Sequence, residues 1–190
     1  MFNHHRGLWG YTGRAADGAP LTIQSTGMGG PSAAIVITEL AELGAHRLVR
    51  TGTCGALNPA LGLGDLVIVT ASIPADGTSR ALGAGGSVAP DERLLAALLA
   101  AGQPEAQAGP VVSTDLFYDG DDQKDWTDRG AVAVEMETAT LFALARRRGL
   151  QAASLLLVSD LLIPRRTRIT AETLRAAERR LGELAAKAFA

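Results

Sequence analysis

The chain has 190 residues, of which 47% are hydrophobic, 20% charged and 4% aromatic, and its formal net charge is −2. This length and composition indicate one soluble domain, and the near-neutral charge gives no reason to expect nucleic acid or an anionic membrane as a partner. The single cysteine, Cys54, excludes an internal disulfide and suits a reducing cytoplasm. No signal peptide and no apolar run long enough to span a bilayer is apparent.

The first half of the chain alternates strand and helix patterns. Residues 20–26 are rich in β-branched side chains and predict a strand that ends in glycines. A helix is expected over 31–44, because it begins with proline and closes with glycine. A second strand is expected over 46–53, and the continuous apolar run at 64–72 predicts a strand buried on both faces.

The second half continues the alternation after a Gly/Ala surface loop near 83–87. A helix is expected over 90–102, followed by a strand over 109–115, a short strand running into a helix within 130–149, a strand over 152–160 and a closing helix over 170–189. Such alternation predicts a single α/β domain over residues 1–190, with a central mixed, mostly parallel sheet flanked by helices.

In sheets of this kind ligands bind at the carboxyl ends of the strands. The residues that follow the predicted strands combine small residues, one arginine, hydroxyls, one aromatic ring and several carboxylates. They are Gly27, Met28, Gly29, Arg50, Gly52, Thr53, Thr114, Asp115, Phe117, Glu135, Met136, Glu137, Ser159 and Asp160.

Arg50 ends an apolar strand and is followed at once by glycines. With the Thr53 hydroxyl and nearby backbone N–H groups it could hold a phosphate-like anion. A structural ion pair with an acid of the sheet is an equally good interpretation. The glycines around Gly27 could form an anion cradle before a helix, although turn chemistry explains them as well.

The carboxylates allow several interpretations. Glu135 and Glu137 could form an acid–base pair, or one could accept hydrogen bonds from ligand hydroxyls while the other caps backbone, or both could be solvated in a first helical turn. Asp160 follows a buried strand, so it could be a proton donor with a raised pKa or a turn cap. The histidines have no metal-ligand spacing, and Cys54 has no histidine near it that would activate a thiol.

Taken together, six segments resemble the nucleoside phosphorylase family, which includes purine nucleoside phosphorylase and uridine phosphorylase. They are RGLWGYTG, STGMGGPSAAIVITELAELG, LVRTGTCGAL, STDLFY, VEMETATLFALA and VSD, in the order of the family. The resemblance implies an enzyme that cleaves the N-glycosidic bond of a nucleoside with inorganic phosphate as co-substrate and no other cofactor. It also implies a homo-oligomer built from dimers, a hexamer, in the cytoplasm.

The resemblance assigns roles residue by residue. Phosphate would be held by Arg50, Thr53 and Gly27, and by Arg6 of the adjacent subunit. Asp160 would protonate N7 of a purine. The ribose and base would be bound by Met28, Phe117, Val134, Glu135, Met136 and Glu137, with His5 reaching in from the adjacent subunit. No metal is implied.

The expected base is a purine, because the acid of VSD and Met28 are purine-type features. A uridine phosphorylase remains the alternative, although FYDGDDQKDW offers only a displaced Gln123 and no matching arginine. Arg165, Arg166 and Arg168 are equal candidates to assist Asp160.

The chain starts after the strand and Gly/Arg loop with which the family begins, so the sheet is expected to have an unfilled place and the phosphate site one arginine fewer. A shortened nucleoside-binding member with weak turnover is therefore a further alternative, and hydrolytic nucleosidases rank below it.

Overall fold

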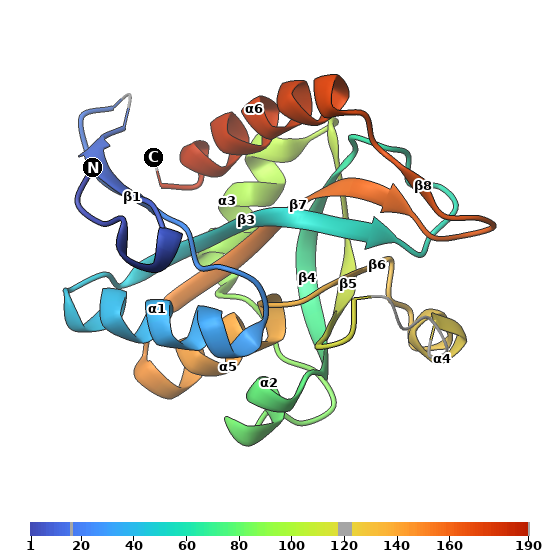
Figure 1. Cartoon of the computed structure of the whole chain (residues 1–190), viewed down its shortest axis with the longest axis horizontal. Coiled ribbons are helices and arrows are strands. Elements are labelled where there is room, and N and C mark those ends of the chain that lie inside the picture. Colours follow the sequence, from blue (N-terminus) through green and yellow to red (C-terminus); the bar gives the residue numbers. More distant parts are fainter. Residues whose placement is uncertain (16, 118–122, 190) are drawn as a thin grey trace.

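The computed structural model describes residues 1–15, 17–117 and 123–189 (Figure 1). Its elements in chain order are η1 (His5–Gly7), β1 (Gly10–Arg14), β2 (Pro20–Gln24), α1 (Gly30–Glu42), β3 (Arg47–Ala56), β4 (Leu66–Ala75), α2 (Gly77–Ala81), α3 (Glu92–Gly102), β5 (Ala106–Thr114), α4 (Gln123–Asp128), β6 (Ala133–Glu135), α5 (Thr138–Arg148), β7 (Gln151–Leu161), β8 (Thr167–Arg168) and α6 (Ala171–Lys187).

Residues at the helix ends explain where the predicted helices begin and end. Proline stands in the first turn of α1, where its missing N–H leaves no helical hydrogen bond unmade. Asp91 caps α3 by accepting from the backbone N–H groups of Arg93 and Leu94. Thr170 caps α6 in the same way, and α5 ends at Gly149 in the left-handed conformation. Each predicted helix is therefore confirmed, with ends shifted by at most two residues.

Five strands of the sheet, β3, β6, β5, β4 and β7, pair in a closed cycle. The order is β3-β6-β5-β4-β7-β8, and β3 also pairs with β7. The two long ladders, β3 with β7 and β4 with β5, are parallel, whereas β3–β6, β4–β7 and β7–β8 are short and antiparallel. The mixed, mostly parallel sheet in an α/β domain is thus confirmed.

Helices cover both faces of this sheet (Figure 1). Alternate residues of β7 pack into two different apolar clusters. Leu156 and Val158 pack with the apolar side chains of α1 and α5. Leu155 and Leu157 point the other way and pack with α3 and α6. Period-two alternation therefore divides the core into two layers around one strand.

The edge of β3 is open along most of its length. Within the described residues, β3 pairs with β7 from Arg47 to Ala56, and β6 joins its other side only at Gly55 and Ala56. The remaining edge of β3 borders the main cavity of the molecule.

Four short elements, η1, α2, α4 and β8, were not predicted. α2 depends on a tertiary interaction, because its cap Asp76 also accepts a hydrogen bond from Thr140 of α5. The predicted loop at 83–87 lies outside helices and strands.

Candidate active site

A cavity of about 960 Å³ lies beside β3 and is bounded by the chain after β2, the start of α5 and the C-terminal part of α6. Ten of the predicted site residues line it. They are Gly27, Met28, Arg50, Thr53, Phe117, Val134, Glu135, Met136, Glu137 and Asp160. The topology thus gathers residues that are up to 133 positions apart, from Gly27 to Asp160, at one end of the sheet.

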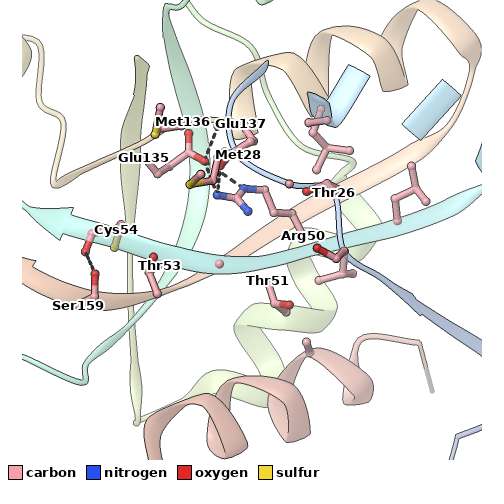
Figure 2. A pocket seen from close by; sticks show the side chains of 18 of the residues that line it. Thr26, Met28, Arg50, Thr51, Thr53, Cys54, Glu135, Met136, Glu137 and Ser159 are labelled. Atoms are coloured by element: carbon pink, nitrogen blue, oxygen red, sulfur yellow. Dashed lines mark hydrogen bonds and ion pairs between the residues drawn. The ribbon is translucent and has the colours of Figure 1, made fainter. Parts of the chain in front are cut away.

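Arg50 is the cation at the centre of this cavity. Its guanidinium reaches from β3 to two carboxylates: Nε donates to Glu135 Oε2 at 3.0 Å, and Nη2 contacts Glu137 Oε2 at 2.5 Å (Figure 2). The Arg50 side chain is 15% exposed. Arg50 therefore forms an ion pair with acidic residues, as one of its two predicted interpretations stated.

Gly52 makes this arrangement possible. A Cβ atom at Gly52 would lie 2.4 Å from Nη1 and 2.8 Å from Cζ of Arg50. The guanidinium therefore passes over the bare backbone of the residue two positions further along the same face of β3. A side chain at this position would push Arg50 away from the two glutamates.

Glu135 is buried and accepts hydrogen bonds from several protein donors. Besides Arg50, it accepts from the backbone N–H groups of Glu137 at 2.9 Å and Thr138 at 2.9 Å, and from the Ser113 hydroxyl. Its side chain has 0% exposed surface. The predicted solvated first turn is therefore wrong for Glu135, because every one of these partners is part of the protein.

Glu137 lies at the junction of β6 and α5 with its carboxylate toward the cavity. Oε1 accepts from the Gly29 N–H at 2.5 Å, and Oε2 faces Arg50. Burial raises the pKa of the Glu137 carboxyl above its usual value, although Arg50 and the Gly29 N–H favour the ionised form. This carboxylate can accept hydrogen bonds from ligand hydroxyls that enter the cavity.

Asp160 ends β7 on the far side of β3 from the glutamates. Ser159 donates to Asp160 Oδ2 at 2.8 Å, and Arg166 donates to Oδ1 through Nε at 3.1 Å and Nη2 at 3.0 Å. Arg168 Nε lies 3.5 Å from the same oxygen. Among the three arginines, Arg166 is thus the one that makes a two-nitrogen contact with Asp160 and also lines the cavity.

Apolar side chains also line the cavity. Met28 is 86% exposed and follows Gly27, whose positive φ of +75° and closeness to Ser32 favour glycine. Phe117 is 49% exposed, and the guanidinium of Arg166 lies 5.1 Å from its ring centroid. These surfaces suit the flat face of a base and the carbon face of a sugar.

Thr53 lines the cavity, but strand alternation points its side chain to the face of β3 opposite Arg50. The joint contact of Arg50 and Thr53 with one phosphate stays a prediction.

His5 and Arg6 are exposed on η1 and are not among the residues that line the cavity. Arg6 has a φ of +55°, which is uncommon for a residue other than glycine. Their predicted reach into a neighbouring subunit stays a prediction too.

Cys54 is buried at 3% exposure, and burial raises the pKa of its thiol. This agrees with a packing role rather than a nucleophile. No group of histidine, cysteine, aspartate and glutamate that could hold a metal ion occurs among the described residues.

The segment FYDGDDQKDW bears on the recognition of uracil. Residues 118–122 of this segment lie outside the described part of the chain, whereas Gln123 begins α4 and lines the cavity.

Several lining residues were not predicted. Trp9 and Tyr11 come from the N-terminal hairpin, and Arg47 lies against Phe189 at the far end of the cavity. The role of Ser113 could not be read from its strand pattern, because only the fold shows that this strand lies beside Glu135. The importance of Gly52 could have been predicted from the sequence. A glycine two residues after an arginine on the same strand leaves room for the arginine side chain.

The whole chain, residues 1–190, matches the model of the family described as the phosphorylase superfamily. The chain therefore belongs to the phosphorylase superfamily, and its predicted resemblance to the nucleoside phosphorylases is confirmed.

Curated relatives agree with this assignment. A guanosine phosphorylase of Halorubrum lacusprofundi is 43% identical over 153 residues, which cover 77% of this chain and 64% of the relative. DeoD-type purine nucleoside phosphorylases of Alkaliphilus metalliredigens and Geobacillus kaustophilus are 40% and 37% identical, with 85% and 84% of this chain and 72% and 70% of the relatives covered. The chain thus spans about two thirds of the length of these relatives.

Within the described residues, no helix is long and apolar enough to cross a bilayer.

Proposed function

We propose that this chain catalyses the phosphorolysis of a purine ribonucleoside or deoxyribonucleoside, releasing the free base and (deoxy)ribose 1-phosphate. Inorganic phosphate is the co-substrate and no further cofactor takes part. The relatives support this proposal, since their names specify guanosine and purine nucleosides. The observation that carries it is that one cavity has Arg50, Glu137 and Asp160 among its charged lining residues.

These three groups match the charges of the reaction. As the bond between C1′ and the base breaks, its electron pair leaves with the base and positive charge develops on the ribose. A phosphate oxygen held by Arg50 forms the new bond to C1′ and stabilises that charge. Glu137 accepts from the sugar hydroxyls and fixes the ribose in line. Asp160, assisted by Arg166, donates a proton to N7, so that the base departs uncharged.

The assembly proposed for this enzyme is a hexamer built from dimers, in the cytoplasm. Arg6 and His5 support it, because both are exposed on η1 away from their own cavity. A neighbouring subunit would receive Arg6 at its phosphate site and His5 near its ribose.

The test is release of free base from inosine, guanosine, adenosine and uridine, each with and without phosphate. The proposal requires base release from at least one purine nucleoside that depends on phosphate. Release of base from uridine alone would favour a uridine phosphorylase. Release of base at a rate that does not depend on phosphate would favour a hydrolase. Nucleoside binding without any release would leave a binding protein and overturn the proposed activity.

A further inference from the structure

Glu135 joins four parts of the site through one carboxylate. It lies on β6 and contacts Arg50 on β3, Ser113 on β5 and the backbone N–H groups that begin α5. Its side chain has no exposed surface, whereas the side chain of Glu137 is 9% exposed. The two glutamates, two residues apart, therefore have different environments.

The hydrogen-bonding capacity of Glu135 is used by the protein. A carboxylate has about four lone-pair sites. Oε1 accepts from the Ser113 hydroxyl, and Oε2 accepts from Arg50 Nε at 3.0 Å and Glu137 N at 2.9 Å. The N–H of Thr138 is shared between the two oxygens, at 3.0 Å from Oε1 and 2.9 Å from Oε2. A ribose hydroxyl would have to displace one of these donors.

Two of these donors belong to the proposed ligand contacts. Oε2 of Glu135 lies 3.0 Å from both Nε and Nη2 of Arg50, so Glu135 fixes the plane of the guanidinium. By holding the backbone N–H of Glu137, it fixes the residue whose carboxylate faces the cavity. One buried charge thus sets the direction of both side chains.

We propose that Glu135 is a positioning residue, which orients Arg50 for phosphate and Glu137 for ribose without touching either ligand. This inference rests on the proposed function and separates the two glutamates, which the sequence grouped together. It predicts that loss of the Glu135 charge weakens the binding of both ligands at once, because both contacts depend on the same carboxylate.

Glu135→Gln tests this role, with Glu137→Gln as the matched comparison. Calorimetry measures the affinity of wild type and both variants for inorganic phosphate, for inosine and for 2′-deoxyinosine. Glu135→Gln is expected to weaken all three by about tenfold, the scale seen for partners that orient ligand-binding groups. Glu137→Gln is expected to weaken the nucleosides more than phosphate.

The outcomes separate this inference from the proposed function. Wild type that binds neither phosphate nor inosine would overturn the function and the role of Glu135 with it. Wild type that binds both, with unchanged affinities in Glu135→Gln, would overturn the positioning role alone. A Glu135→Gln loss confined to inosine, with 2′-deoxyinosine and phosphate unaffected, would instead make Glu135 a direct contact of the 2′-hydroxyl.

Glu135→Asp provides a second variant should Glu135→Gln fail to fold. It keeps a buried negative charge but withdraws the carboxylate by one methylene from Arg50 and the start of α5. The same parallel loss of phosphate and nucleoside affinity is expected, and wild-type affinity for phosphate would contradict the inference.

Discussion

Nη2 of Arg50 lies 2.5 Å from Oε2 of Glu137, so the side chains proposed to hold phosphate and ribose contact each other directly. In the proposed reaction, the phosphate at Arg50 and the ribose hydroxyls at Glu137 would therefore lie side by side. The pair keeps both charges compensated in a partly buried site.

Replacing Arg50 tests how far the two buried glutamates depend on it. Arg50→Met leaves Glu135 and Glu137 without their cation, and loss of one partner of a buried ion pair is expected to lower the free energy of unfolding by about 3 kcal/mol. Chemical denaturation measures this change. Arg147→Met, at an exposed position of α5, is the control and should stay within about 0.5 kcal/mol of wild type. Equal stabilities of the two variants would contradict the structural importance of the pair.

Gly52→Ala separates the position of Arg50 from the stability of the fold. The new methyl group would lie within 3 Å of the guanidinium, whose flexible side chain can shift while the cation stays near the glutamates, so less stability should be lost than in Arg50→Met. We expect phosphate to bind about tenfold more weakly, since Arg50 loses its orientation. Gly86→Ala is the control, because nothing lies within 4 Å of its added Cβ. Wild-type phosphate affinity in Gly52→Ala would show that the position of Arg50 does not depend on Gly52.

The raised pKa of Glu137 gives a signature in pH-dependent stability. The folded state retains this proton above pH 4.5, the ordinary value, while the unfolded state has lost it. The folded state therefore binds more protons in this window, and the contribution of Glu137 to stability falls as the pH rises through it. Denaturation of wild type and Glu137→Gln across pH 4 to 7 should show that the stability of wild type relative to the variant falls as the pH rises. Parallel curves of stability against pH for the two proteins would contradict the raised pKa of Glu137.

Asp160→Asn tests the proposed proton donor. An amide cannot supply the proton to N7, so turnover of a purine nucleoside should fall by about 100-fold or more, while nucleoside affinity changes little. Steady-state kinetics with inosine measures the effect. Glu178→Gln, on the exposed face of α6, should retain wild-type turnover. An unchanged rate in Asp160→Asn would remove Asp160 from this role.

Mixing two inactive variants tests whether sites are shared between subunits. If Arg6 serves a neighbour, Arg6→Met and Arg50→Met each impair every site of their own homo-oligomers. In mixed oligomers some sites combine Arg50 of one chain with Arg6 of the other, so activity should partly return after the two are unfolded and refolded together. Activity that stays at the level of the separate variants would place Arg6 outside the neighbouring phosphate site.

Local patterns were sufficient to predict much of this molecule. The long strands and helices follow from apolar runs and caps, as at Asp91 and Gly149, and the rule that ligands lie at strand ends found most of the cavity. The sequence could not distinguish Glu135 from Glu137, because their difference depends on Ser113 and Arg50, which are distant in the chain. The sequence also could not show which of the three arginines contacts Asp160. Arg166 does so because of the conformation of the turn after β7.

The central claim is phosphorolysis, and the most direct measurement is release of hypoxanthine from inosine at increasing concentrations of phosphate. The account predicts release that rises with phosphate, saturates and is matched mole for mole by ribose 1-phosphate. Hypoxanthine released at the same rate without phosphate, together with free ribose, would contradict it.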